Sequence, residues 1–257
     1  MVALLALLTL TGCLDILEEI WIQADGSARV VVDLAVPKSL LALLKTKEPE
    51  PFADLREKVK AAEVELKKDP DVVKFEFREL DDGAQYHLIY DLTVRDATRL
   101  GELHKRAMTS AAESQKGAGS KGFGFRIERT GSGQYVFTQQ LGELKAGPEQ
   151  GEAPEDAMKS KLAQQMALAM FANNYFTVRV HGPLVTETNG RLNEQKDTVE
   201  WKHSLSALMG GAGKTELHAV VQAGPPLWLW PLVLGVPLLV LVLAVVGAQR
   251  KRSRSAR

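Results

Sequence analysis

The 257-residue chain has a single cysteine, Cys13, and few aromatic side chains, which make up 6% of its residues. One cysteine cannot form a disulfide within the chain, nor can it build the zinc sites that require two or more thiolates. The fold must therefore be stabilised by an apolar core. Hydrophobic residues make up 45% of the chain, which is enough to build one.

The chain also lacks an excess of either charge, because 32 Lys and Arg residues balance 32 Asp and Glu residues. The balance is uneven along the chain. Residues 14–223 hold 27 basic and 32 acidic residues, a net charge of −5. A mildly acidic region does not suit binding to a phosphate backbone, so we predict no nucleic-acid partner.

The first of two hydrophobic stretches is short and lies at the N-terminus. Residues 1–12 contain an apolar run with the length of a signal peptide, too short to span a membrane. A leucine and two small residues then precede Cys13. This order resembles the lipobox of bacterial lipoproteins, which implies cleavage before Cys13 and lipid attachment to its thiol; a buried, unmodified cysteine is the alternative. No Lys or Arg precedes the apolar run, which indicates a start codon upstream of Met1.

The second hydrophobic stretch, residues 227–248, carries no charge along its 22 residues. A helix of this length reaches about 33 Å, slightly more than the hydrocarbon core of a bilayer. Trp228 and Trp230 lie at its start, where interfacial aromatic residues are common, and the tail 249–257 contains five basic residues. The positive-inside rule predicts a single-pass span with a cytoplasmic C-terminus, so residues 13–223 would lie outside a bacterial cytoplasmic membrane. A buried core helix is the alternative.

Alternation of apolar and polar residues predicts three β-hairpins between these stretches. Asp25 and Gly26 form the turn of the first hairpin, and Asp82 and Gly83 form the turn of the second. In the second hairpin, Val73, Phe75 and Phe77 are expected to face one way. The strands of the three hairpins are predicted at 16–22 with 28–36, at 73–77 with 86–94, and at 123–127 with 134–141. Three further strands are predicted at 175–181, 198–205 and 216–222.

Apolar residues at three- and four-residue spacing predict helices at 52–68, 96–112 and 154–173. Hairpins that alternate with helices predict an α+β fold class, with one antiparallel sheet and the helices packed on one of its faces. We expect residues 13–223 to form one extracytoplasmic domain. Two smaller domains, divided in the loop 142–153, are the alternative.

No motif in the sequence identifies a catalytic residue. Residues 210–215 end like a nucleotide-binding P-loop, but Leu208 stands where the first glycine of that motif belongs, and a strand is predicted to follow. The five histidines lack the spacing of metal ligands, and no serine lies in a Gly-x-Ser-x-Gly sequence. We therefore predict a protein that is not an enzyme and has no metal, nucleotide or other cofactor. A metal site assembled from several strands stays open as an alternative.

One apolar face of the predicted helix 154–173 is a candidate ligand surface. It contains Met158, Leu162, Met166 and Met170. Methionine adapts to varied apolar partners, so this face could contact an acyl chain. Ordinary core packing against the sheet is the alternative.

The order of these features resembles the LppM-type lipoproteins of bacteria. The shared features are the lipobox at Cys13, an exported α+β region and one C-terminal transmembrane helix with a basic tail. Residues 25–34 and 188–201 look similar as well. The resemblance implies an envelope protein in contact with membrane lipids whose exported domain binds lipid or glycolipid. A non-enzymatic structural or assembly protein that binds another envelope protein is the alternative.

Overall fold

The computed structural model of the chain describes residues 14–44, 52–112, 124–131, 133–142, 165, 168–169, 171–209 and 215–224. Its elements, in chain order, are β1 (Asp15–Ile22), β2 (Ala28–Pro37), α2 (Lys38–Leu44), α3 (Ala53–Leu66), β3 (Val72–Asp81), β4 (Gln85–Val94), α4 (Ala97–Ala112), β5 (Phe125–Arg129), β6 (Gln134–Leu141), β7 (Tyr175–His181), β8 (Val185–Thr188), β9 (Arg191–Leu192), β10 (Thr198–Ser204), α6 (Leu205–Met209) and β11 (Thr215–Gln222).

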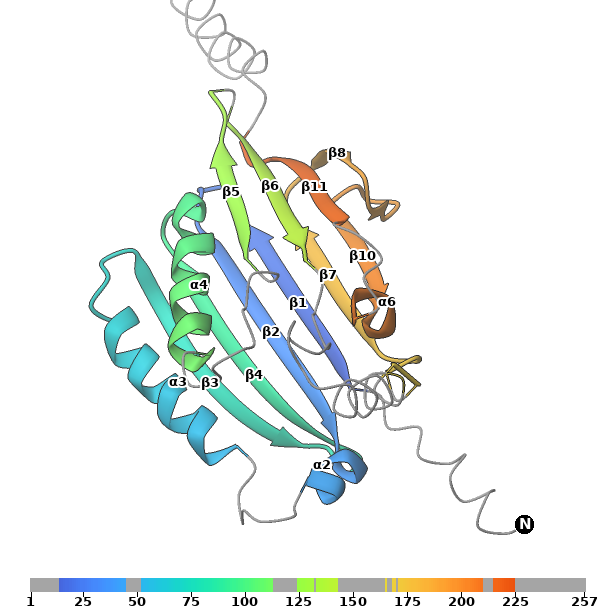
Figure 1. Ribbon diagram of the computed structural model, residues 1–257. Coiled ribbons are helices and arrows are strands. Elements are labelled where there is room, and N and C mark those ends of the chain that lie inside the picture. The colour runs from blue at the N-terminus through green and yellow to red at the C-terminus, as the bar shows by residue number, and fades with distance from the viewer. Residues whose placement is uncertain are drawn as a thin grey trace, which may run out of the picture.

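These elements form two layers (Figure 1). One layer is a seven-stranded sheet with the order β3-β4-β2-β1-β7-β10-β9, called here the large sheet. The other layer contains helices α3 and α4 and a four-stranded sheet with the order β5-β6-β11-β8, called the small sheet. The predicted α+β class is therefore confirmed.

The three predicted hairpins are all present, and their turns have the expected chemistry. Strands β1 and β2, β3 and β4, and β5 and β6 pair in antiparallel fashion. Gly26, Gly83 and Gly133 in their turns have φ angles of 88°, 96° and 74°. Residues with a Cβ rarely adopt such angles, which explains why each turn carries a glycine.

The predicted orientation of Val73 is wrong, because β3 contains a bulge there. Val72 pairs with Val94 and Lys74 pairs with Thr93, which leaves Val73 as an extra residue. Val73 is 57% exposed, whereas Phe75 is buried as predicted. A bulge shifts the alternation by one residue, so Val72 takes the inward position that the pattern assigned to Val73.

The prediction of one antiparallel sheet is also wrong. Strands β5, β6 and β11 form a separate sheet, and β1 pairs with β7 in parallel within the large sheet. Alternation shows that a strand has one buried face, but it does not name the neighbouring strand or the sheet. The parallel pair joins residues 160 positions apart, such as Ile16 and Phe176.

Helices α3 and α4 agree with the predicted helices 52–68 and 96–112, and both lie on one face of the large sheet. The predicted helix 154–173 lies outside the described residues except for 165, 168–169 and 171–173, so its methionine face is not described. The short elements α2, β8, β9 and α6 were not predicted; their lengths of two to seven residues are too small to show a period.

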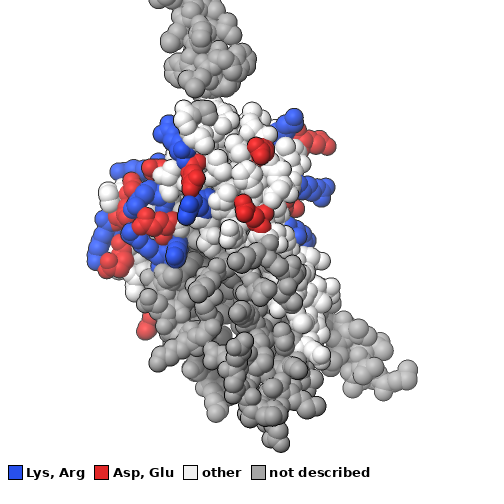
Figure 2. Space-filling view, turned by 45° about the horizontal axis from the view of Figure 1, so that its top comes forward, with Lys and Arg blue, Asp and Glu red and all other residues white. Residues whose placement is uncertain are grey.

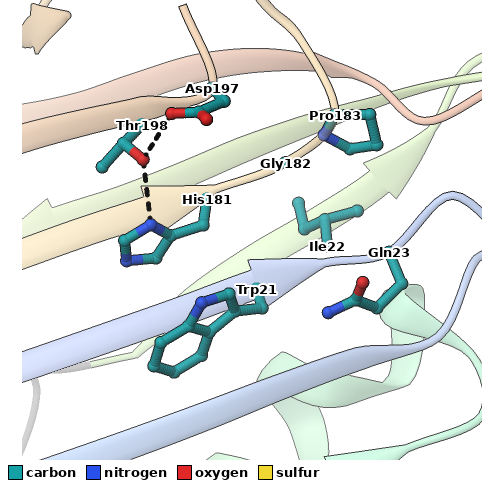
Figure 3. Close-up of a pocket in the computed structure, with 8 residues that line it drawn as sticks. All are labelled: Trp21, Ile22, Gln23, His181, Gly182, Pro183, Asp197 and Thr198. Carbon is teal, nitrogen blue, oxygen red and sulfur yellow. Dashed lines mark hydrogen bonds between the residues drawn. The ribbon is translucent and has the colours of Figure 1, made fainter. Parts of the chain in front are cut away.

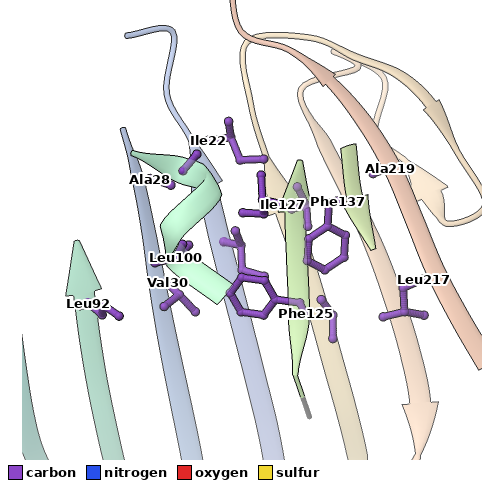
Figure 4. Packing of buried hydrophobic residues seen from close by; sticks show 14 of the residues in the cluster. Ile22, Ala28, Val30, Leu92, Leu100, Phe125, Ile127, Phe137, Leu217 and Ala219 are labelled. Atoms are coloured by element: carbon purple, nitrogen blue, oxygen red, sulfur yellow. The ribbon is translucent and has the colours of Figure 1, made fainter. Parts of the chain in front are cut away.

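The apolar core lies between the two layers (Figure 4). Val30 and Leu92 of the large sheet, Leu100 of α4, and Phe137 and Leu217 of the small sheet are each 0% exposed. One hydrophobic cluster contains all of them. Burial of such side chains contributes roughly 1.5–3 kcal/mol each, so the contact between layers is the main source of stability.

No helix among the described residues is long and apolar enough to cross a membrane. The predicted signal peptide 1–12, Cys13, the predicted span 227–248 and the tail 249–257 all lie outside the described residues.

The segment 188–201 has a structural role, because Asn189 joins the two sheets. Its Oδ1 accepts hydrogen bonds from Trp201 Nε1 of β10 at 2.9 Å and from the His218 backbone N–H of β11 at 3.0 Å. Its Nδ2 donates to the Glu216 carbonyl at 2.7 Å. One side chain thus satisfies donors from both layers.

We expect Asn189→Ala to lower the free energy of unfolding by about 2 kcal/mol, because the buried indole N–H of Trp201 would lose its acceptor. Urea unfolding followed by far-UV circular dichroism measures the change. Trp201→Phe is the matched background, since it removes the indole N–H and keeps an aromatic ring, and Asn189→Ala should cost less stability in that background than in the parent. Equal losses in the two backgrounds would show that the bond to Trp201 contributes little.

Candidate functional site

A pocket of about 350 Å³ opens at the carboxyl ends of the parallel strands β1 and β7 (Figure 3). Its walls come from three places in the sequence. They are the end of β1 with Trp21, Ile22 and Gln23, the end of β7 with His181, Gly182 and Pro183, and the start of β10 with Asp197 and Thr198.

The pocket forms here because the chain leaves β1 and β7 in different directions. After β1 the chain turns into β2 of the large sheet, whereas after β7 it crosses to β8 of the small sheet. Adjacent parallel strands whose exits diverge leave a crevice beyond their carboxyl ends, a common place for ligand sites. A Cβ on Gly182 would lie 2.2 Å from Val221 Cγ1, so only glycine lets the chain cross so close to β11.

Trp21 occupies the centre of a row of side chains on the outer face of the large sheet. Its ring stacks on the His181 ring, with 4.9 Å between centroids and 9° between planes. The Arg29 guanidinium, from the strand on the other side of β1, lies 5.2 Å from the Trp21 ring centroid. The indole therefore stands between two cross-strand neighbours and presents its edge to the pocket.

His181 and Asp197 determine the charge of the pocket. The Thr198 hydroxyl donates to Asp197 Oδ1 at 2.9 Å, so His181 Nδ1 is the donor in its 3.0 Å contact with Thr198 Oγ1. Burial lowers the pKa of His181 below its usual value. Hydrogen bonds from Asn193 and then Thr198 lower the pKa of Asp197. At neutral pH the pocket thus contains a neutral imidazole and an ionised carboxylate.

Positive charge near the pocket is already neutralised. Arg29 forms two hydrogen bonds to Asp91, at 2.8 and 2.9 Å, and Arg179 contacts Glu200 at 2.8 Å and Glu19 at 3.3 Å. Among the described residues that line the pocket, none is Lys or Arg. Figure 2 shows that basic and acidic side chains also lie beside one another elsewhere on the visible described surface. The pocket thus offers an anion no counter-charge.

A second polar cluster lies inside the core and joins both layers. Gln139 Nε2 of β6 donates to Glu18 Oε2 of β1 at 3.0 Å, and the Tyr90 hydroxyl of β4 contacts His104 Nδ1 of α4 at 2.7 Å. His104 Nε2 is 3.7 Å from Glu18 Oε1, which has no hydrogen-bond partner among the described residues. Burial raises the pKa of Glu18 to about 7, against the lowering effect of the Gln139 hydrogen bond. This cluster is enclosed by core residues, so we assign it to the core and not to a ligand site.

The residues that line this pocket include none of the candidate site residues singled out in the sequence. Cys13, Met158, Leu162, Met166 and Met170 lie outside the described residues, as do 210–214 of the glycine-rich segment. Strand β11 follows that segment, as predicted. Within the described part of the chain, no group of three or more His, Cys, Asp or Glu residues is placed to hold a metal ion.

Sequence reasoning missed the pocket, and no local signal could have found it. Its residues come from 21–23, 181–183 and 197–198, and none of these segments forms a motif. Only the parallel pairing of β1 with β7 brings Trp21 opposite His181.

Comparison with known proteins gives one structural similarity. The chain matches no protein-family model and no curated protein. It is similar to the NMR structure of the folded domain of LppM from Mycobacterium tuberculosis, with 14% sequence identity and a TM-score of 0.47, over 84% of this chain and 93% of that chain. At this identity and TM-score, the similarity does not transfer a function to the present chain.

Proposed function

We propose that this protein is a non-enzymatic lipoprotein of the bacterial cell envelope whose exported domain binds a glycolipid, with the sugar head group in the Trp21–His181 pocket. The observation that carries the proposal is the chemistry of the pocket. It combines an ionised carboxylate, a carboxamide and apolar walls, and it contains no Lys or Arg among its described lining residues.

A sugar fits this chemistry better than a phosphate does. Sugar hydroxyls both donate and accept hydrogen bonds, so they can donate to Asp197 and exchange bonds with the Gln23 amide. Pro183 and the Trp21 edge can contact the C–H groups of a sugar ring. A phosphate would meet the Asp197 carboxylate without a cation to offset the repulsion.

The membrane attachment in this proposal rests on the sequence. Lipidation of Cys13 and a single span at 227–248, with the tail 249–257 in the cytoplasm, would keep the domain at the outer surface of the cytoplasmic membrane. The face with Met158, Leu162, Met166 and Met170 stays our prediction for contact with an acyl chain.

We expect Trp21→Ala to weaken sugar binding at least tenfold, because the pocket would lose its central wall, a change of about 1.4 kcal/mol or more. The measurement is saturation-transfer NMR with methyl glucoside and methyl mannoside, using the full chain in phospholipid nanodiscs. Gln23→Ala should weaken binding as well, since its exposed side chain contributes a wall of the pocket.

Tyr175→Ala is the matched control, because Tyr175 is an aromatic residue at the opposite end of the outer face, where it contacts Lys202. It should bind sugar as the parent does. Inositol phosphate tests the charge argument and should show no binding. Binding of inositol phosphate that is lost in Trp21→Ala would overturn the assignment to a neutral sugar, and equal sugar binding in all variants would place the site elsewhere.

One observation favours the alternative, an assembly protein that binds another protein. Strand β3 is an outer strand of the large sheet, and its Val73 and Leu80 are 57% and 54% exposed. The same strand has a bulge and carries Lys74, Glu76 and Arg78, features that oppose edge-to-edge pairing. We therefore rank this function second. Loss of a co-isolated protein partner in Leu80→Asp, with sugar binding absent in the parent, would reverse the ranking.

A further inference from the structure

The chain segments that lead to the two predicted membrane attachments leave the described domain at opposite ends of β7. At the start of β7, Asn174 Nδ2 donates to the Leu14 carbonyl at 2.9 Å, so the chain that leads from Cys13 enters there. At the other end, the Gln222 N–H donates to the carbonyl of Leu184, which lies just beyond β7. The chain that leads to 227–248 therefore exits at the end that holds the pocket.

The distance between the two ends of β7 is larger than the reach of the residues that link the domain to its two predicted attachment points. Eight steps of extended chain from Asn174 to Gly182 span about 26 Å at 3.3 Å per residue. Cys13 adjoins Leu14 directly, and the three Cα–Cα steps from Gly224 to residue 227, where the predicted span begins, reach at most about 11 Å. If the domain stood upright on residue 227, Cys13 would lie too far above the bilayer for its lipid to insert.

We infer that the domain lies lengthwise on the outer surface of its own membrane, with the β1–β7 axis parallel to the bilayer and the pocket held near the head groups. This inference rests on the proposed function, because it requires both attachments. The partner surface is thus a lipid bilayer that contacts both ends of the domain.

The position of the pocket follows from this geometry. Gly182 of the pocket is in close contact with Val221, which precedes Gly224 by three residues. Val221, at the edge of the pocket, is therefore within about 22 Å of residue 227 along extended chain, at up to 3.6 Å per residue. The sugars of a glycolipid in the same membrane can reach that distance, so the pocket takes its ligand from the membrane that carries the protein.

Short-range quenching by lipids with a nitroxide on the head group tests the orientation. A fluorophore is attached through Ser39→Cys in one sample and through Gly131→Cys in another, each in the full chain in vesicles. Ser39 lies at the Leu14 end, since β2 ends at Pro37 and its Ala35 pairs with Asp15. Gly131 lies at the other end, next to Gly133, whose carbonyl accepts from Ala223, and a Cβ there meets open space.

We expect strong quenching at both positions in the lipidated chain. Removing the lipid with Cys13→Ser, in a chain that also lacks the apolar residues 1–12, should reduce quenching at least twofold at residue 39 and leave residue 131 unchanged. The lipidated chain without an added cysteine is the labelling control, because its single thiol is consumed by the lipid.

Quenching at residue 131 alone in the lipidated chain would overturn the lengthwise orientation and leave the proposed function intact, since sugar binding is measured separately. Quenching at neither position would overturn the membrane attachment itself, and with it both proposals. Equal quenching at residue 39 with and without Cys13 would show that the lipid does not hold that end, which also contradicts the inference.

Discussion

Gly101→Ala is expected to lower the free energy of unfolding by about 3 kcal/mol, a large part of the 5–15 kcal/mol typical of a domain. Gly101 is buried in the second turn of α4. A Cβ built there would lie 2.3 Å from the carbonyl oxygen of Phe125 and 3.2 Å from its carbonyl carbon. These are backbone atoms of β5, so no rotamer change can relieve the clash and α4 must move away from the small sheet.

Helix propensity alone would make Gly101→Ala stabilising, which is the opposite of the expected loss of stability. In a free helix, alanine in place of glycine would stabilise by up to about 1 kcal/mol, so a net loss must come from the contact with β5. Movement of α4 would also loosen Leu100 and Leu103, which are 0% exposed in the core between the layers.

Chemical unfolding monitored by circular dichroism and tryptophan fluorescence measures the change. Gly131→Ala is the matched control, because a Cβ at that position has nothing within 4 Å, and it should change stability by less than about 0.5 kcal/mol. Because the core residues of both sheets belong to one cluster, we expect circular dichroism and tryptophan fluorescence to report the same single unfolding transition. A Gly101→Ala variant as stable as the parent would show that α4 does not pack on β5 at this distance.

A second large effect is expected from pH, through Glu18. Its pKa is about 7 in the folded state, raised mainly by burial, against 4.5 for an exposed glutamate. Between these two values the folded state binds more protons than the unfolded state does. The contribution of Glu18 to stability is therefore fully present below pH 4.5 and is lost as the pH rises to 7, by about 3 kcal/mol in total.

Glu18→Gln should remove this part of the pH dependence, because the amide cannot ionise. We expect parent and variant to have similar unfolding midpoints at pH 5, and the variant to be the more stable of the two at pH 8. The groups that face Glu18 are Gln139, His104 and, through His104, Tyr90. Burial first, and then the charges of Glu18 and Asp91, raise the pKa of Tyr90, which therefore stays neutral in this range.

Glu187→Gln is the matched control for Glu18→Gln, since the Glu187 side chain is 74% exposed on β8. It should leave the pH profile of the parent unchanged. The contrary result is a parent that keeps the same stability relative to Glu18→Gln at pH 5 and at pH 8. That result would show that Glu18 ionises in the folded state at little cost.

The sequence alone was sufficient for the hairpins and for the two long helices α3 and α4. Asp25 with Gly26 and Asp82 with Gly83 identified their hairpins because a tight turn needs a positive φ that glycine adopts easily. Helices 52–68 and 96–112 were found because an apolar stripe repeats with the helical period. The bulge at Val73 was missed because two valines in succession fit either register.

Tertiary structure alone decided the arrangement of the strands and the position of the pocket. The alternation of residues in a strand shows which of its faces is buried, but it does not identify the strand that pairs with it. Neither the small sheet nor the parallel contact of β1 with β7 could therefore be predicted. That contact places Trp21 beside His181 and leaves the crevice where β7 crosses to β8. The sequence by itself determined the hairpins and the helices 52–68 and 96–112, because these depend on neighbouring residues, and the membrane attachments stay predictions from the sequence. The candidate site depends on side chains 160 positions apart, which only the folded sheet brings together.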